Sequence, residues 1–151
     1  MLPLATLFSL VPIVAISAQA IAIPHIQEHH STNGTLRSLN DCGTLDASPS
    51  GHKWLLWASC KKKDGSQRCT RLDLDKCYGD DNGKLVAKKD GKFTDHCDSC
   101  RMGSGNTAFG CVCNEDRNKV VWVTPGDLVT NDDGYLECYD SDHKGEETCG
   151  Q

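Results

Sequence analysis

The sequence predicts a mainly β protein that is stabilised by disulfide bonds and built from two similar halves. Three observations indicate this fold class: short segments of strand character alternate with turn signals, ten cysteines follow residue 41, and the chain carries an internal repeat. No segment of residues 42–140 keeps an apolar period of 3.6 residues for three turns, as an amphipathic helix would. We therefore expect one mainly β domain over residues 42–140.

Six segments have the apolar, β-branched or alternating character of strands. Asn-Gly and Asp-Gly dipeptides between such segments are strong hairpin signals, because these residues tolerate the positive φ of type I′ turns. The turn signals are Asp64-Gly65, Asn82-Gly83, Asp90-Gly91, Pro125-Gly126 and Asp133-Gly134. The expected strands are Lys53–Ser59, Thr70–Leu74, Lys84–Ala87, Phe109–Cys113, Lys119–Thr124 and Tyr135–Tyr139.

An internal repeat becomes visible when the sequence is shifted by 51 residues. The identities fall on the cysteine that opens each unit, on the hairpin glycine and on the apolar residue after the turn. Two β units that complete one another's core would explain this pattern. The aligned pairs are Cys60 with Cys111, Asp81 with Asp132, Gly83 with Gly134 and Leu85 with Leu136.

The N-terminal segment indicates secretion. Residues 1–20 contain no charged residue and end in the small-x-small pattern Ala18-Gln19-Ala20, which is typical of a cleaved signal peptide. A membrane anchor is the alternative, because the apolar run continues to residue 23. We expect residues 21–41 to be a mobile leader with an N-glycosylation sequon at Asn33, and residues 141–151 to be a C-terminal tail.

The ten cysteines behind a signal-type segment are expected to be oxidised, since disulfides persist outside the cell. Zinc is the alternative, because Cys97-x-x-Cys100 and Cys111-x-Cys113, beside His96, superficially resemble ligand pairs. We favour disulfides and expect no metal and no other cofactor.

The charge balance and motifs restrict the function. Lys and Arg number 16 against 21 Asp and Glu, and the net charge of −5 argues against nucleic-acid binding. The chain lacks a G-x-S-x-G element, and acidic pairs are inevitable in so acidic a chain, so we expect neither an enzyme nor catalytic residues. After signal cleavage no membrane association is expected.

Two strings carry a resemblance to a known family. CKKKDGSQRCTRLDLDKCYGDDNGKL at Cys60–Leu85 resembles the first repeat of the cyanovirin-N homology (CVNH) family of small lectins, with its apolar-Asp-Leu-Asn/Asp element and its Gly-rich hairpin. Lys92-Phe93, followed by Cys97, resembles the family's Asn-Phe element. The second repeat corresponds to Phe109–Cys111 and Thr130–Leu136.

The resemblance implies a cyanovirin-N-like fold: one elongated, disulfide-stabilised domain of two pseudo-symmetric β repeats, here about residues 42–92 and 93–140. It also implies two bridges, Cys42–Cys60 and Cys97–Cys111. Six cysteines remain, and sequence cannot choose among their fifteen pairings. For them we prefer Cys100–Cys113, since both lie two or three residues beyond a family bridge, and less strongly Cys69–Cys77.

Members of the family bind mannose-rich oligosaccharides, so the resemblance implies that the partners are high-mannose glycans or glycoproteins. Sugar hydroxyls need rigidly held carboxylates, amides and backbone groups, and the turns supply them. Trp54, Trp57 and Trp122 are stacking candidates or core residues. Matching the family's site places Asp80, Asn82, Lys92, Asp95, His96 and Asn114 in one half, and Asn40, Asp41, Lys61, Lys63, Asn131 and Asp133 in the other.

Some positions depart from the family pattern. Ala87 replaces a usual Trp, Lys92 replaces an Asn, and Pro125 stands where the second repeat usually has Leu. These changes keep an alternative open: a secreted, disulfide-rich interaction protein on the same scaffold that has lost sugar binding. The oligomeric state also stays open, including a dimer formed by exchange of the similar halves.

Overall fold

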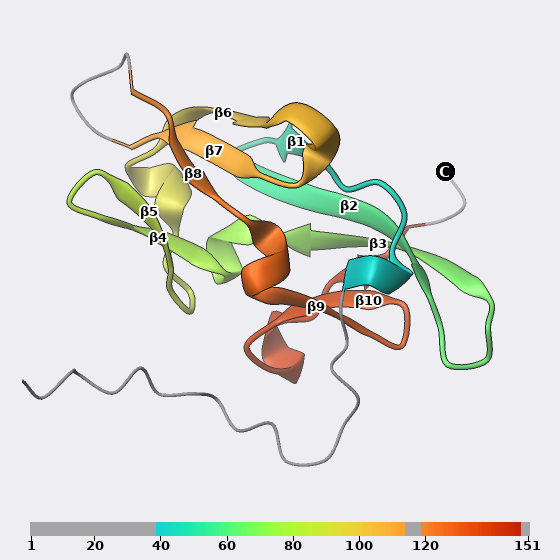
Figure 1. Ribbon diagram of the computed structural model, residues 1–151. Coiled ribbons are helices and arrows are strands. Elements are labelled where there is room, and N and C mark those ends of the chain that lie inside the picture. The colour runs from blue at the N-terminus through green and yellow to red at the C-terminus, as the bar shows by residue number, and fades with distance from the viewer. Residues whose placement is uncertain (1–38, 114–118, 149–151) are drawn as a thin grey trace, which may run out of the picture. The chain divides into compact units, whose positions relative to one another are not determined.

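The computed structural model describes residues 39–113 and 119–148 (Figure 1). The signal-type segment, Asn33 and most of the expected leader lie outside these residues. The described chain is mainly β, with short 3₁₀-helices and no α-helix among the described residues. None of the described helices is long and apolar enough to cross a membrane.

Two antiparallel sheets and two hairpins make up the fold (Figure 1). The first sheet has the order β1-β2-β3-β11 and the second the order β6-β7-β8. The strands of the sheets are β1 (Asp46–Ser50), β2 (Lys53–Lys61), β3 (Gln67–Asp73), β11 (Glu146–Glu147), β6 (Asp98–Met102), β7 (Phe109–Val112) and β8 (Val121–Val123). The hairpins are β4 (Tyr78–Asp81) with β5 (Lys84–Ala87), and β9 (Val129–Asp132) with β10 (Tyr135–Cys138).

The internal repeat is confirmed in three dimensions. A 3₁₀-helix precedes each hairpin, η2 (Leu74–Lys76) before β4 and η5 (Pro125–Asp127) before β9, and helices and hairpins alike are offset by 51 residues. Each hairpin lies against the sheet of the other repeat, since β10 contacts β3 and β5 contacts β8. The two units therefore complete one another's core, as the repeat predicts.

Both hairpin turns have the expected type I′ character. Asn82 and Gly83 have φ values of 51° and 78°, and Asp133 and Gly134 have φ values of 53° and 90°. Asn, Asp and Gly accept this left-handed backbone at low cost, which explains their place in the turns. The turns hold the exposed polar residues of the hairpins in fixed positions.

All six expected strands are present, and five further strands were not predicted. β1, β4, β6, β9 and β11 are short and rich in polar residues, so their sequences lack the alternation that predicts a strand. β1 includes Pro49 and lies at a sheet edge, the place in a sheet where proline is tolerated. The tail segment is paired as well: η6 (Ser141–His143) leads to β11, which pairs with β3.

The described cysteines are all disulfide-bonded, which excludes the zinc alternative for the cysteine pairs. The expected Cys42–Cys60 bridge is present. Three expected pairings are wrong: the structure has Cys97–Cys113 in place of Cys97–Cys111, Cys100–Cys111 in place of Cys100–Cys113, and Cys77–Cys138 in place of Cys69–Cys77. Cys69 is bonded elsewhere.

The pairing of β6 with β7 explains the two exchanged bridges. The antiparallel register places Asp98 opposite Val112, so the residue before Asp98 faces the residue after Val112. Cys97 is therefore opposite Cys113, and their Cα atoms are 4.0 Å apart. The other bridge, across the β-bulge that follows Asp98, is nested inside the first one. The expected pairing would have crossed the two bridges.

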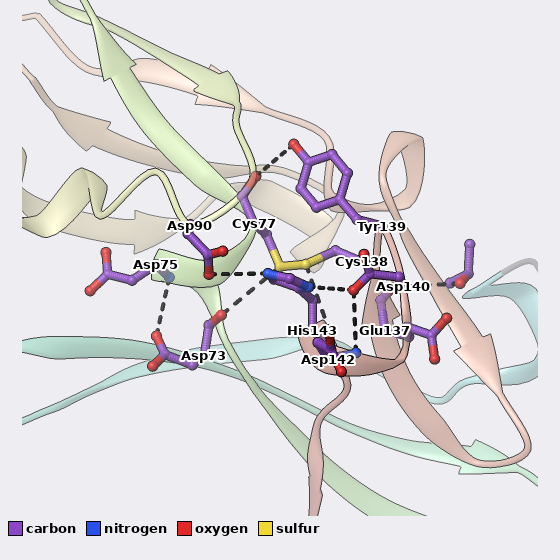
Figure 2. The surroundings of a disulfide bond; sticks show 11 residues. Asp73, Asp75, Cys77, Asp90, Glu137, Cys138, Tyr139, Asp140, Asp142 and His143 are labelled. Atoms are coloured by element: carbon purple, nitrogen blue, oxygen red, sulfur yellow. Dashed lines mark hydrogen bonds and ion pairs between the residues drawn. A yellow bond between two sulfur atoms is a disulfide. The ribbon is translucent and has the colours of Figure 1, made fainter. Parts of the chain in front are cut away.

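The Cys77–Cys138 bridge joins the first repeat to the end of the second, and its cysteines are 61 positions apart in the sequence (Figure 2). Both cysteines are fully buried. The Tyr139 hydroxyl donates a hydrogen bond of 3.2 Å to the Cys77 carbonyl, and Figure 2 shows this contact beside the bridge. The bridge and the hydrogen bond anchor the chain where it leaves β10.

A histidine beside this bridge links two carboxylates (Figure 2). The His143 side chain is buried, with Nδ1 2.5 Å from Asp140 Oδ1 and Nε2 3.0 Å from Asp90 Oδ1. The hydrogen bond to Asp140, and to a smaller extent the one to Asp90, raise the pKa of His143 above its usual value of 6.5. Hydrogen bonds from Lys89 and His143 lower the pKa of Asp140 to about 2. The network ties the loop after β5 to η6.

The network predicts how stability depends on pH. The raised pKa of His143 gives a stabilisation that is complete below pH 6.5 and is lost as the pH rises through the folded-state pKa. The lowered pKa of Asp140 gives a second stabilisation of the folded state, which is present above pH 3.8 and is lost as the pH falls towards about 2. We expect Tm, measured across this range, to decline on both sides of mildly acidic pH.

The variant His143→Gln isolates the alkaline part of this decline. Its Tm should be lower than that of the unmodified protein at pH 5, and the difference should shrink as the pH is raised. A difference in Tm that is the same at pH 5 and at pH 9 would contradict the assignment of the alkaline decline to His143.

Candidate functional site

The structure brings together most of the expected site residues that lie around Asn131. We call the set Asn40, Asp41, Lys61, Lys63, Asn131 and Asp133 site A. η1 (Leu39–Asp41) contacts β9, and the β2–β3 turn meets the β9–β10 turn. The Lys63 backbone N–H donates a 2.8 Å hydrogen bond to Asp133 Oδ1, 70 residues away in the chain.

Asn131 holds site A together from inside. It is buried, its Nδ2 donates to the Lys61 carbonyl at 2.9 Å, and its Oδ1 accepts from the Gly134 N–H at 2.7 Å. Both ends of the amide are therefore engaged within the protein. Asn131 positions the site, and the exposed side chains around it are the ones open to a ligand.

The Asp133 turn is fixed by a residue that the sequence does not single out. Arg68, in β3, donates from Nη1 to the Asp133 carbonyl at 2.8 Å, and its guanidinium lies 4.0 Å from the centre of the Tyr135 ring. The hydrogen bond from the Lys63 N–H lowers the pKa of Asp133, which keeps this carboxylate ionised. Asp133 and Tyr135, the partners of Arg68, belong to the other repeat and follow it by more than 60 residues, so no local sequence pattern reveals these contacts.

The second set of residues gathers around the β4–β5 hairpin. We call the described members, Asp80, Asn82, Lys92, Asp95 and His96, site B; Asn114 lies outside the described residues. η3 (Phe93–Asp95) contacts β4, and the backbones of Lys92 and Gly79 pair. Asn82, Lys92, Asp95 and His96 are exposed.

Asp80 occupies in site B the place that Asn131 has in site A. Its Oδ1 accepts a hydrogen bond of 3.0 Å from the Gly83 N–H, as Asn131 does from Gly134. Its carboxylate also lies within 4.8 Å of the sulfurs of Cys97 and Cys113. This group is no metal site, because the two sulfurs form a disulfide and are not thiolates. The bridge instead places Asp80 beside the chain that carries His96.

Two glycines determine how closely η3 approaches the hairpin. A Cβ on Gly91 would lie 2.5 Å from the Tyr78 carbonyl oxygen and 2.6 Å from the Gly79 Cα, so a side chain there would push the two backbones apart. Lys92 follows with a positive φ of 48° and precedes η3 as its N-cap residue. This close packing holds η3, which includes Asp95, against strand β4.

The three tryptophans differ in their surroundings. Trp54 is half-buried against Phe109, and Trp57 donates from Nε1 to the Ser48 hydroxyl at 3.0 Å. Trp122 is 46% exposed. None of the three belongs to site A or site B, so within the described residues both sites consist of polar side chains.

The side chains of sites A and B are suited to forming hydrogen bonds with a polar ligand. Each site places exposed ionised and amide side chains around a rigid turn, and such groups match the alternating donors and acceptors of sugar hydroxyls. A model of the CVNH domain matches residues 37–137. The chain belongs to the CVNH family. This is a family of non-catalytic lectins, and the strand order described above is a cyanovirin-N-like fold.

Solved structures of CVNH proteins support the fold. GzCVNH of Gibberella zeae superimposes with a TM-score of 0.56 at 20% identity, covering 70% of this chain and all of that one (100%). A MoCVNH3 variant in complex with (N-GlcNAc)4 gives 0.56 at 14% identity, covering 71% and 99%. TbCVNH of T. borchii gives 0.54 at 20% identity, covering 67% and 97%. No curated protein sequence matches the chain.

The CVNH match ends before several features of this chain. Cys138, the Asp140–His143 network and β11 all follow residue 137. This segment extends the first sheet and closes a cavity of about 250 Å³ beside Arg71 and Asp73, away from both sites. The addition anchors the C-terminal part of the described chain to β3.

Proposed function

We propose that this CVNH protein is a lectin that binds mannose-rich oligosaccharides at sites A and B without catalysing a reaction. One observation carries the proposal: the two repeats build the same construction twice. In each, a type I′ turn is hydrogen-bonded to Asp80 or Asn131, and a 3₁₀-helix that carries exposed polar residues contacts the first strand of the hairpin. A repeated, rigid and polar surface suits a ligand that itself repeats.

Two further points support sugar as the ligand class. The residues of both sites correspond to those of the family's site elements, and the structurally similar MoCVNH3 variant was solved with (N-GlcNAc)4. The turns beside the binding groups are held by hydrogen bonds between backbone groups and the side chains of Asp80, Asn131 and Asp133, which lowers the entropy lost when an oligosaccharide is ordered against them. High-mannose glycans of glycoproteins are therefore the proposed partners.

Calorimetric titration of the oxidised protein with α-linked mannotriose tests the proposal. We expect saturable binding with two sites per chain. The variants Asn82→Gly with Asp95→Asn should remove site B only, since glycine keeps the left-handed turn that Asn82 adopts. The variants Asp41→Asn with Lys61→Gln should remove site A only. Each pair should halve the stoichiometry, and each serves as the control for the other.

Two results would contradict the proposal. Unchanged stoichiometry in both pairs of variants would place sugar binding elsewhere on the molecule. Absence of heat from a protein with native circular dichroism, for mannotriose and for (N-GlcNAc)4 alike, would favour the alternative of an interaction protein that has lost sugar binding.

We also propose that the protein is secreted. The described cysteines are all oxidised, and such disulfide-dense domains belong to oxidising compartments. The signal-type segment of residues 1–20 supports the same location. Sequencing the N-terminus of the protein recovered from culture medium tests this, and an intact Met1 on a membrane-bound protein would contradict it.

A further inference from the structure

Trp122 and Tyr139 are the exposed large apolar residues of the described chain, and Trp122 is the more exposed of the two. It lies in β8, at the edge of the second sheet (Figure 1). A single exposed aromatic residue is common on a protein surface, so the case for a binding site rests on what surrounds this ring. Neither the core nor sites A and B use this ring.

The sheet supports the indole as a flat platform. Trp122 is paired with Gly110 of β7, and a Cβ on Gly110 would lie only 2.5 Å from the indole. A Cβ on Gly103 would lie 3.1 Å from the same ring. The indole therefore rests directly on glycine backbone. Its exposed surface borders a cavity of about 410 Å³.

The cavity carries a single charge, and it is positive. Arg101 of β6 pairs with Gly110 from the other side, so Arg101 and Trp122 flank the same glycine, and the guanidinium lies 5.6 Å from the indole centre. Among the described residues no carboxylate forms an ion pair with Arg101, in a chain whose net charge is −5. The lining consists of Arg101, Met102, Gly103, Ser104, Ala108 and Trp122.

The lining determines which ligand fits. A pyranose ring stacks its C–H face on an aromatic face, because the hydrogens of these C–H groups are weakly positive and the face of the indole is negative. Neutral sugar hydroxyls need acceptors as well as donors, and among the described lining residues the Ser104 hydroxyl is the one side-chain oxygen that can accept a hydrogen bond. A guanidinium fork instead matches the two oxygens of a carboxylate.

We propose that the Trp122 surface binds a carboxylate-bearing hexopyranose, such as a hexuronate unit of an acidic oligosaccharide, with the ring stacked on Trp122 and the carboxylate paired with Arg101. This site is separate from sites A and B and goes beyond the proposed function. It would let the protein contact two chemically different glycans, one neutral and one acidic.

NMR titration with α-1,4-linked trigalacturonate tests the proposal, followed by the indole Nε1–H signal of Trp122 and, in Trp122→Leu, by the backbone amide signal of Gly110 in the paired strand. We expect a saturable shift of this signal, and an affinity about tenfold lower or worse for Arg101→Gln and for Trp122→Leu. The methyl ester of the same trisaccharide should bind as weakly to the unmodified protein as the acid does to Arg101→Gln. The site B variants should bind trigalacturonate normally.

Three results would overturn the proposal: no shift of the Trp122 signal at millimolar trigalacturonate, equal affinity for the acid and its methyl ester, or unchanged affinity in both variants. Dispersed spectra of the variants show that they are folded. Because Arg101 and Trp122 belong to neither site A nor site B, failure of this test is distinguishable from failure of oligomannose binding.

Discussion

Removal of the Cys77–Cys138 disulfide, by Cys77→Ala with Cys138→Ala, is expected to lower the free energy of unfolding by about 4 kcal/mol. The bridge closes a loop of 61 residues and connects the two repeats, so its loss releases much chain entropy in the unfolded state. Guanidinium denaturation of the protein with its other bridges oxidised measures the effect. A loss of this size is a large part of the stability of a domain this small.

The nested bridge of the β6–β7 hairpin provides a matched control. Cys100 and Cys111 are separated by 11 residues and lie inside the loop that Cys97–Cys113 already closes. Replacement of both by alanine also removes buried cysteines, but it frees little additional chain in the unfolded state. We expect less than half of the destabilisation found for the long bridge. Equal losses in the two variants would show that the long bridge does not act by restraining the repeats.

The parts of the fold that the sequence predicts depend on local chemistry. The β4–β5 and β9–β10 turns could be predicted because Asn82-Gly83 and Asp133-Gly134 favour left-handed backbone whatever surrounds them. The strands β2 and β5 could be predicted from their apolar residues. The mutual completion of the two repeats followed from an offset that is visible in the sequence.

The parts that escaped prediction depend on register and on distant partners. A β-bulge in β6 and the antiparallel alignment with β7 decide which cysteines meet, and neither feature has a local signal. Asn131 looked like an open ligand-binding residue, yet its amide is bonded to a carbonyl 70 residues earlier. The exposure of Trp122 depends on Gly110 in the neighbouring strand. Turn chemistry thus predicts where polar groups lie, and tertiary contacts decide which of them face a ligand.

Replacement of Phe109 by alanine is expected to lower the free energy of unfolding about as much as removal of the Cys77–Cys138 disulfide does. Phe109 is fully buried in β7, and its ring centre lies 5.8 Å from those of Trp54 in the first sheet and Phe93 in η3. Phe109→Ala should lower the free energy of unfolding by about 3–5 kcal/mol, because it removes a large apolar side chain from a place where the backbone cannot collapse. Phe109→Leu, which keeps most of the volume, should cost about 1 kcal/mol.

The same ring connects the core to site B. Phe93 begins the 3₁₀-helix that carries Asp95, so a smaller residue at 109 loosens the packing beneath η3 and leaves the β2–β3 turn of site A unchanged. In the stable Phe109→Leu variant we expect mannotriose affinity to fall at site B and to persist at site A, as seen by titrating this variant with each site removed in turn. Equal weakening at both sites would mean that Phe109 stabilises the whole domain without positioning η3. Loss confined to site B would show that the aromatic contacts between the two halves also hold a binding site in place.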